Sequence, residues 1–392
     1  MNELRQFGTL SNSEETDRLG EVLCQCFNLP LNEWDKYRDR IGGENFRILR
    51  QGRAIVGGLG IYHMGQWWGG DRVSMAGIAA VGVLPEDRGT GAAVELLTHT
   101  LGELHRQGIA LSTLYAATQR VYRKVGYEQA GEFCDWEVTL DSIQMRDRTL
   151  PLHRVESIHA EVFAPIYRQQ ALHYNGNLDR NFAIWQQILQ PKGDEVVYAD
   201  LVGNPNQPEG YIIFTQKNTA QGVKLVVLDW VALTPAAARR LWTFLGDARS
   251  QISTATWRGS SVDSLLLFLP EQTAKITHLE RWFMRVVNVK IALEQRGYPV
   301  TLNAELHLEV RDTLLPENNG KFILTVSGGR GKVTPGGRGD LRLDPRGLSP
   351  LYSGLYRPYQ LQLAGHLEGT PNAVSVATEI FAGSPPWMPD FF

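Results

Sequence analysis

Cysteine is scarce in this sequence, and the few cysteines exclude a large class of proteins. Only Cys24, Cys26 and Cys134 occur among 392 residues, and an odd number of thiols fits reduced cysteines better than a disulfide framework. Cys24 and Cys26 form no familiar metal spacing with the 9 scattered histidines, so we expect no metal site. The cysteines are therefore predicted to be small, buried apolar side chains.

An excess of one charge and long apolar runs are also missing. The formal net charge is -3, with 43% hydrophobic and 21% charged residues, so nothing in the composition would attract nucleic acid or an acidic membrane. No run of about 18 apolar residues could span a membrane, and Met1–Leu10 has no basic stretch followed by an apolar one. We expect a cytoplasmic globular protein that binds neither nucleic acid nor membrane.

The length of the chain predicts several domains, since about 150 residues usually form one. Hydrophobic spacing predicts two opening helices, a hairpin, a further strand, a long amphipathic helix and closing strands. The same order restarts in the middle of the chain, and short alternating strands with glycine-rich turns come last. We therefore predict an α/β (α+β) protein with domains at 1–150, 151–290 and 291–392.

The strongest local signal is a glycine loop between a strand and a helix. The strand Ile78–Leu84 ends at Pro85, and the loop then reads Arg88-Gly89-Thr90-Gly91-Ala92-Ala93. Glycines let a ligand approach the backbone amides, and the positive end of the helix dipole attracts the phosphates of a pyrophosphate. A plain strand-to-helix turn is the alternative, because the loop matches neither the dinucleotide-binding motif nor the P-loop.

The second copy of this arrangement lacks the loop chemistry. The strand Val226–Leu233 takes the place of Ile78–Leu84, but the following Thr-Pro-Ala-Ala-Ala-Arg-Arg contains none of the glycines of the first copy. We therefore predict a second copy of the fold that does not bind phosphates.

The loop and the strand before it carry a family resemblance. The segment Arg88-x-x-Gly91-x-Ala93, after a strand with Val-x-Val, resembles the acetyl-CoA loop of the GCN5-related N-acetyltransferase (GNAT) superfamily. The resemblance implies that the pantetheine arm runs beside this strand, while the next strand splays away at Leu114–Ala117 and leaves a wedge for the thioester. The residues implied to bind acetyl-CoA are Ala80, Val81, Gly82, Val83, Arg88, Gly89, Thr90, Gly91, Ala92 and Ala93.

A second segment, from Val121 to Tyr127, is similar to the superfamily's aromatic stretch beside the CoA sulfur. The similarity implies that Tyr122 is the general acid, because a phenol with a pKa of about 10 can protonate the departing thiolate. Both Tyr122 and Tyr127 could instead be core residues, and for Tyr127 we favour that interpretation. No carboxylate of the first domain stands out as a base.

The whole chain is similar to the Eis (enhanced intracellular survival) family of aminoglycoside N-acetyltransferases. The similarity lies in tandem GNAT folds, the second degenerate, followed by a sterol-carrier-protein-like α+β domain. It implies acetyl-CoA as co-substrate, a primary amine of an aminoglycoside or similar polyamine as acceptor, and a homo-oligomer, namely a hexamer. It also implies that the terminal carboxylate, here on Phe392, is the base, held by the proline- and aromatic-rich tail. A loose tail that packs nowhere is the alternative.

A cationic acceptor needs acidic and aromatic pocket walls. By position in family-like segments, the candidates are Phe27, Trp34, Asp35 and Asp390, although the aromatic ones could equally be core residues. Two other functions stay open. One is a lipid or small-molecule binding protein with a vestigial transferase domain, and the other is an aminoacyl transferase of the tandem GNAT type.

Overall fold

The computed structural model describes residues 4–190, 193, 195–220 and 222–392, which divide into two compact units. Unit 1 contains the chain up to Ala130, Trp282–Ser384 and Phe392, and unit 2 contains Gly131–Arg281 and Pro385–Phe391. The predicted domain ends at residues 150 and 290 stay a prediction.

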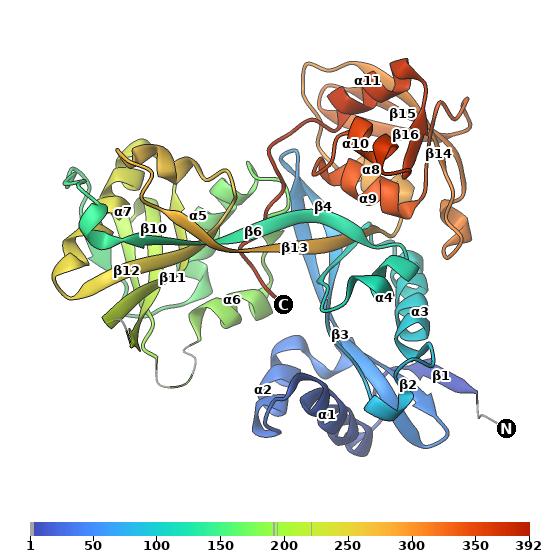
Figure 1. Ribbon diagram of the computed structural model, residues 1–392, viewed down its shortest axis with the longest axis horizontal. Coiled ribbons are helices and arrows are strands. Elements are labelled where there is room, and N and C mark those ends of the chain that lie inside the picture. Colours follow the sequence, from blue (N-terminus) through green and yellow to red (C-terminus); the bar gives the residue numbers. More distant parts are fainter. Residues whose placement is uncertain (1–3, 191–192, 194, 221) are drawn as a thin grey trace. The chain divides into compact units, whose positions relative to one another are not determined.

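Unit 1 begins with a mixed sheet in the order β1-β2-β3-β4-β5-β13 (Figure 1). The strand β4 pairs with β5 in parallel, and the other neighbours are antiparallel. The strands are β1 (Arg5–Gly8), β2 (Phe46–Gln51), β3 (Ala54–Trp68), β4 (Asp71–Val83), β5 (Leu111–Tyr115) and β13 (Lys275–Val286), of which only the end from Trp282 lies in this unit.

Four helices accompany this sheet, namely α1 (Ser13–Phe27), α2 (Asn32–Ile41), α3 (Ala92–Arg106) and α4 (Gln119–Lys124). The first two and α3 confirm the two opening helices and the long amphipathic helix that the sequence predicts. The first begins at Asn12, whose side chain accepts a hydrogen bond from the amide of Glu15 and so satisfies a free helix amide. The long helix α3 buries Leu97, Leu101 and Leu104 against the strands, as the spacing of these residues predicts.

The two copies of the fold exchange strands, which no pattern in the sequence predicted. The strand β13 comes from the second copy, yet Trp282–Val286 pairs with all of β5 in unit 1. Conversely, β6 (Glu128–Thr139) begins in unit 1, and its residues Cys134–Thr139 pair with β12 (Ile252–Gly259) in unit 2. The strands predicted to close the first domain form one long strand, β6. The strands β12 and β13 were not predicted.

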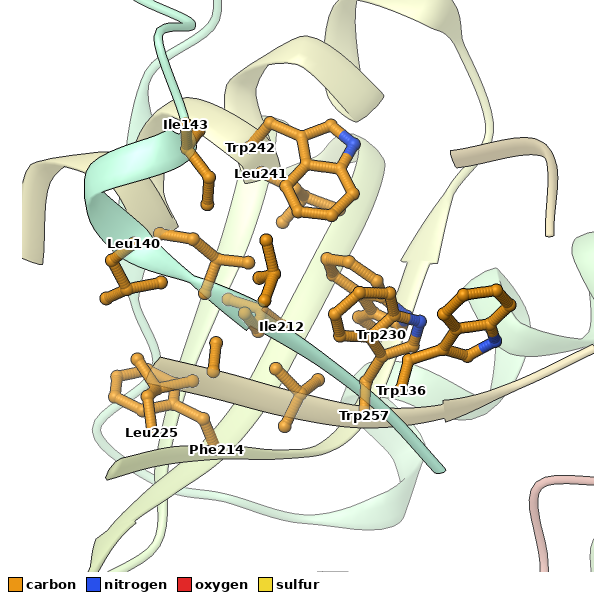
Figure 2. Packing of buried hydrophobic residues seen from close by; sticks show 14 of the residues in the cluster. Trp136, Leu140, Ile143, Ile212, Phe214, Leu225, Trp230, Leu241, Trp242 and Trp257 are labelled. Carbon is orange, nitrogen blue, oxygen red and sulfur yellow. The ribbon is translucent and has the colours of Figure 1, made fainter. Parts of the chain in front are cut away.

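Unit 2 repeats the element order of unit 1, which confirms the predicted second copy. Its sheet order is β6-β12-β11-β10-β9-β7. The other strands and α-helices are β7 (Leu152–Arg154), β8 (Leu178–Asp179), β9 (Tyr198–Asn204), β10 (Gln207–Thr219), β11 (Gly222–Ala232), α5 (Ala160–Ala171), α6 (Phe182–Leu189) and α7 (Pro235–Asp247). Figure 2 shows the tryptophan-rich core between sheet and α7, where the ring of Trp257 lies 5.5 Å from that of Trp230 and 5.6 Å from that of Trp242.

The remaining part of unit 1 is a small α+β fold, as predicted. Its sheet has the order β16-β15-β14-β17-β18. The elements are β14 (Ala304–Val310), β15 (Gly320–Ser327), β16 (Arg330–Pro335), β17 (Leu341–Leu343), β18 (Leu367–Gly369), α8 (Val289–Gln295), α9 (Pro345–Ser353), α10 (Pro358–Leu363) and α11 (Pro371–Ile380). In the described parts of the chain, no helix is long and apolar enough to cross a membrane.

Candidate active site

The strands β4 and β5 share only a short ladder, and they separate where we predicted a splay. Met75–Gly77 pairs with Leu111–Thr113, while β4 runs on to Val83 and β5 to Tyr115. After Gly77, β4 no longer pairs with β5 along the edge that faces away from β3. Such an edge leaves backbone N–H and C=O groups for an extended ligand that adds like a strand.

A bulge distorts β4 in this free stretch. The register between β3 and β4 shifts between Gly58 and Gly60, and the opposing Ala80 has φ 49°, in the left-handed region. A non-glycine residue in this conformation costs of order 1–3 kcal/mol and is typical of functional sites. The bulge therefore turns the backbone out of the regular ladder within the segment expected to bind pantetheine.

The glycine loop after β4 leaves the amino end of α3 uncapped. Gly89 and Gly91 have φ of 79° and 93°, which glycine adopts without strain, and a Cβ on either would meet no atom within 4 Å. Gly91 is the N-cap of α3, and no side-chain hydrogen bond caps this helix. The loop therefore presents free helix amides to open space, the arrangement that binds phosphate groups.

Two arginines lie at this loop, although the sequence indicated only one. The Nε of Arg88 donates to the carbonyl of Val83 at 3.2 Å. The Nη2 of Arg5 donates to Oγ1 of Thr90 at 2.5 Å, and its Nη1 forms an ion pair with Glu95 at 3.3 Å. Arg5 belongs to β1, so no local pattern in the sequence could place it beside the loop.

Tyr122 is buried on α4 beside the aromatic ring of Tyr127, with 6.1 Å between ring centroids. Burial raises the pKa of Tyr122 to about 12. Among the residues that the structure describes, none forms a hydrogen bond with the Tyr122 hydroxyl. Tyr127 is fully buried and its hydroxyl lies 2.7 Å from Oγ of Ser112, which confirms the core role favoured for it.

The aromatic ring of Phe392 lies at the end of the β4–β5 ladder. It packs against the rings of Tyr62 on β3 and Tyr115 on β5, at centroid distances of 5.8 and 5.9 Å. A Cβ added to Gly77, the last ladder residue of β4, would lie 2.5 Å from Cε2 of Phe392. A glycine is therefore required here to admit the ring. No pattern in the sequence gave a sign of this contact.

Comparison with known proteins agrees with this geometry. Family models described as "Acetyltransferase (GNAT) domain" match residues 9–130 and 176–286, and one described as "Sterol carrier protein domain" matches residues 289–389. A solved GCN5-related N-acetyltransferase from Anabaena variabilis is 50% identical, with a TM-score of 0.97 over 99% of this chain and 100% of that one. This chain belongs to the GCN5-related N-acetyltransferase family.

Two curated relatives show which members of the family this chain resembles. An uncharacterized N-acetyltransferase from Streptomyces avermitilis is 26% identical over 99% of this chain and 95% of its own. The N-acetyltransferase Eis from Mycobacterium tuberculosis is 28% identical over 74% of each chain. This GNAT protein is therefore Eis-like, with tandem acetyltransferase domains and a sterol carrier protein domain, and membership implies acetyl-CoA as co-substrate and an amine as acceptor.

The second GNAT domain differs from the first at the helix that would meet the phosphates. Thr234 is the N-cap of α7, and its side chain accepts a hydrogen bond from the amide of Ala237, while Pro235 occupies the first turn and has no backbone N–H. The side chain of Thr234 therefore caps this helix, whereas no side chain caps α3. This contrast gives a physical reason for the predicted degeneracy.

The four predicted acceptor contacts have different surroundings, each within its own unit. On α2, Trp34 is buried against Phe46, while Asp35 is exposed and forms an ion pair with Arg38 at 2.8 Å. Phe27 is exposed at the end of α1, and Asp390 lies in unit 2. Trp34 thus has the surroundings of a core residue. In the described residues, no three His, Cys, Asp or Glu side chains form a group that could hold a metal ion.

Proposed function

We propose that the first GNAT domain transfers the acetyl group of acetyl-CoA to a primary amine of an aminoglycoside or a similar polyamine. The single observation that best supports the proposal is the end of the β4–β5 ladder. There the free edge of β4 leads to the uncapped helix α3, and the ring of Phe392 fills the place where the strands separate. The acceptor class rests on the resemblance to the Eis family, as does the proposed hexamer.

In the proposed reaction, the amine nitrogen attacks the thioester carbonyl, so a C–N bond forms while the carbonyl π bond opens. Collapse of this tetrahedral intermediate breaks the C–S bond, and the hydroxyl of Tyr122 gives its proton to the leaving sulfur. A pKa of about 12 supports this role, because the phenol stays protonated at neutral pH. Its lack of a hydrogen-bond partner within the described residues leaves the proton available.

The proposed base is the α-carboxylate of Phe392, in a protein whose chain ends at this residue. It would accept the proton that the amine loses on attack. An α-carboxyl group has a pKa of about 3.3 to 3.7 in water, so it becomes a useful base only where apolar surroundings raise that value. The aromatic rings of Tyr62 and Tyr115, which pack against the ring of Phe392, support apolar surroundings at this end of the chain.

The test is release of free CoA from acetyl-CoA with a panel of aminoglycosides and simple polyamines, run beside calorimetric binding of acetyl-CoA alone. Amine-dependent CoA and an acetylated product of matching mass would support the proposal. Binding of acetyl-CoA without transfer to any amine would favour a binding protein with a vestigial transferase domain. A protein that does not bind acetyl-CoA would favour aminoacyl transfer of the tandem GNAT type.

The role of Phe392 has its own test. A protein extended by a few residues after Phe392 keeps the ring but loses the free carboxylate, so we expect its kcat to fall about as far as that of Tyr122→Phe. Light scattering on the same preparations measures the proposed hexamer. An extended protein with full activity would show that Phe392 only packs.

A further inference from the structure

The tail before Phe392 is held in unit 2 by a series of hydrogen bonds. Its backbone follows β6, since the amide of Glu132 donates to Pro386 and the amide of Met388 donates to Glu132. Side chains add to this: Nδ2 of Asn177 donates to the carbonyl of Trp387 at 2.9 Å, and Nε2 of Gln187 donates to that of Phe391 at 2.8 Å. These hydrogen bonds therefore hold the tail in unit 2 from Pro386 to Phe391.

The tail lies where the strands β11 and β12 of unit 2 separate, which corresponds to the separation of β4 and β5 in unit 1. In unit 2, the parallel ladder of β11 and β12 ends at Val226 and Thr256. A cavity of about 410 Å³ lies beyond that point, and its walls include Trp257 of β12 together with Pro389, Asp390 and Phe391 of the tail. The domain whose helix α7 is capped by its own Thr234 thus holds the protein's own chain beside its separating strands.

One buried charge cluster fixes the tail there. Arg180 forms an ion pair with Asp390 at 2.9 Å and with Asp229 at 2.6 Å, and these three side chains are at most 5% exposed. The hydroxyl of Tyr211 donates to Asp229 at 2.6 Å, and the Arg180 guanidinium lies 3.7 Å from the ring centroid of Tyr167. A carboxylate is buried only where a partner compensates the lost hydration, and Arg180 is such a partner for Asp390.

We propose that Arg180 and Asp390 are positioning residues for acetyl transfer. Their ion pair holds Asp390 two residues before Phe392, so it restricts where the Phe392 ring and carboxylate can lie. The proposal rests on the proposed function of Phe392 as base. It gives the degenerate GNAT domain a role in the reaction, which is to hold the tail that supplies the base. A reacting group that shifts by about 1 Å can lose about 100-fold in rate.

The variant Asp390→Ala tests this proposal. It leaves the neutral Arg180–Asp229 pair in place, so the fold of unit 2 should survive, with a thermal midpoint close to that of the wild type. We expect kcat to fall about 10- to 100-fold with little change in the KM for acetyl-CoA. Asp390→Asn keeps an acceptor for Arg180 and should recover part of the rate. The control Asp247→Asn breaks an exposed ion pair with Arg148 and should change nothing.

A second readout separates failure of the ion pair from failure of Phe392. Carboxypeptidase A should release Phe392 faster from Asp390→Ala than from the wild type, whatever the activity of either protein. Unchanged release together with unchanged kcat would overturn the positioning role. If release is faster and kcat is unchanged, the activity of the protein extended after Phe392 separates two explanations. Full activity of that protein would show that Phe392 is not the base. Lost activity of that protein would show that Phe392 is the base but that Asp390 is not needed to position it.

Discussion

Replacing Gly77 by alanine tests whether the place of the Phe392 ring controls turnover. The new Cβ would lie 2.5 Å from Cε2 and 2.9 Å from Cδ2 of Phe392, and 2.9 Å from Cε of Met64. Gly77 is not among the residues with positive φ, so the alanine backbone itself is unstrained. The substitution therefore acts on the ring of Phe392 and on a flexible methionine end, without breaking the strand.

The size of the effect follows from these distances. Nonbonded carbons prefer about 3.5 to 4.0 Å, so the ring must move by about 1 Å. A shift of that size at a reacting group costs about 100-fold in rate, and overpacking costs about 1–3 kcal/mol of stability. We expect Gly77→Ala to lower kcat about 10- to 100-fold while the protein stays folded at 25 °C.

The assay is CoA release at saturating acetyl-CoA, with a thermal melt on each protein. Gly102→Ala in α3 is a matched control, because its Cβ meets only Nη1 of Arg106 at 3.5 Å, an ordinary contact. In a Phe392→Ala background, Gly77→Ala should cause no further loss, since the ring is gone. The reasoning would be refuted if Gly77→Ala had the same kcat as the wild type. It would also be refuted if Gly77→Ala lowered kcat equally in the wild type and in Phe392→Ala.

Two further predictions concern Tyr122 and the loop. Tyr122→Phe should lower kcat about 100-fold or more at an unchanged KM for acetyl-CoA. A general acid works below its pKa, so a pKa of about 12 for Tyr122 predicts no loss of kcat from its ionisation up to pH 10.5, and a falling limb centred near pH 10 would contradict this. Gly91→Ala places a Cβ at φ 93°, a strain of about 1–2 kcal/mol, and should weaken acetyl-CoA binding about tenfold by calorimetry. Gly365→Ala, at φ 74° and also without neighbours within 4 Å, carries the same strain and should leave binding unchanged.

Local sequence patterns predicted the parts of the site that are contiguous in the chain. The loop Arg88–Gly91 and the helix after it combine glycine, a strand end and a helical apolar spacing, and all three signals act within about 20 residues. The extent of β4 was underestimated, because the expected strand was only Ile78–Leu84, whereas β4 runs from Asp71 to Val83. The pair Gly69-Gly70, with φ of 60° and 87°, is a hairpin signal that would have extended this strand.

The rest of the site depends on contacts between distant residues. Alternation along a strand tells which face a residue lies on, but not which neighbour it meets. Nothing local pairs Arg5 with Thr90, or brings Tyr62 and Tyr115 to Phe392. The resemblance to a family implied that Phe392 takes part in the reaction, which stays a prediction, while the need for glycine at position 77 became visible only in the structure.

The strand exchange predicts that residues 1–150 do not form a working acetyltransferase on their own. This fragment lacks Trp282–Val286, which pairs with the whole of β5, and it lacks Phe283 and Val287, both buried in the core with α3 and Tyr122. Burying two such side chains contributes roughly 3–6 kcal/mol, against a usual total of about 5–15 kcal/mol. We expect the fragment to melt without cooperativity and to lose acetyl-CoA binding, and a fusion of 1–130 with 282–384 to recover both. If 1–150 melts cooperatively and binds acetyl-CoA as the full chain does, then β13 is dispensable and the domain does end near residue 150.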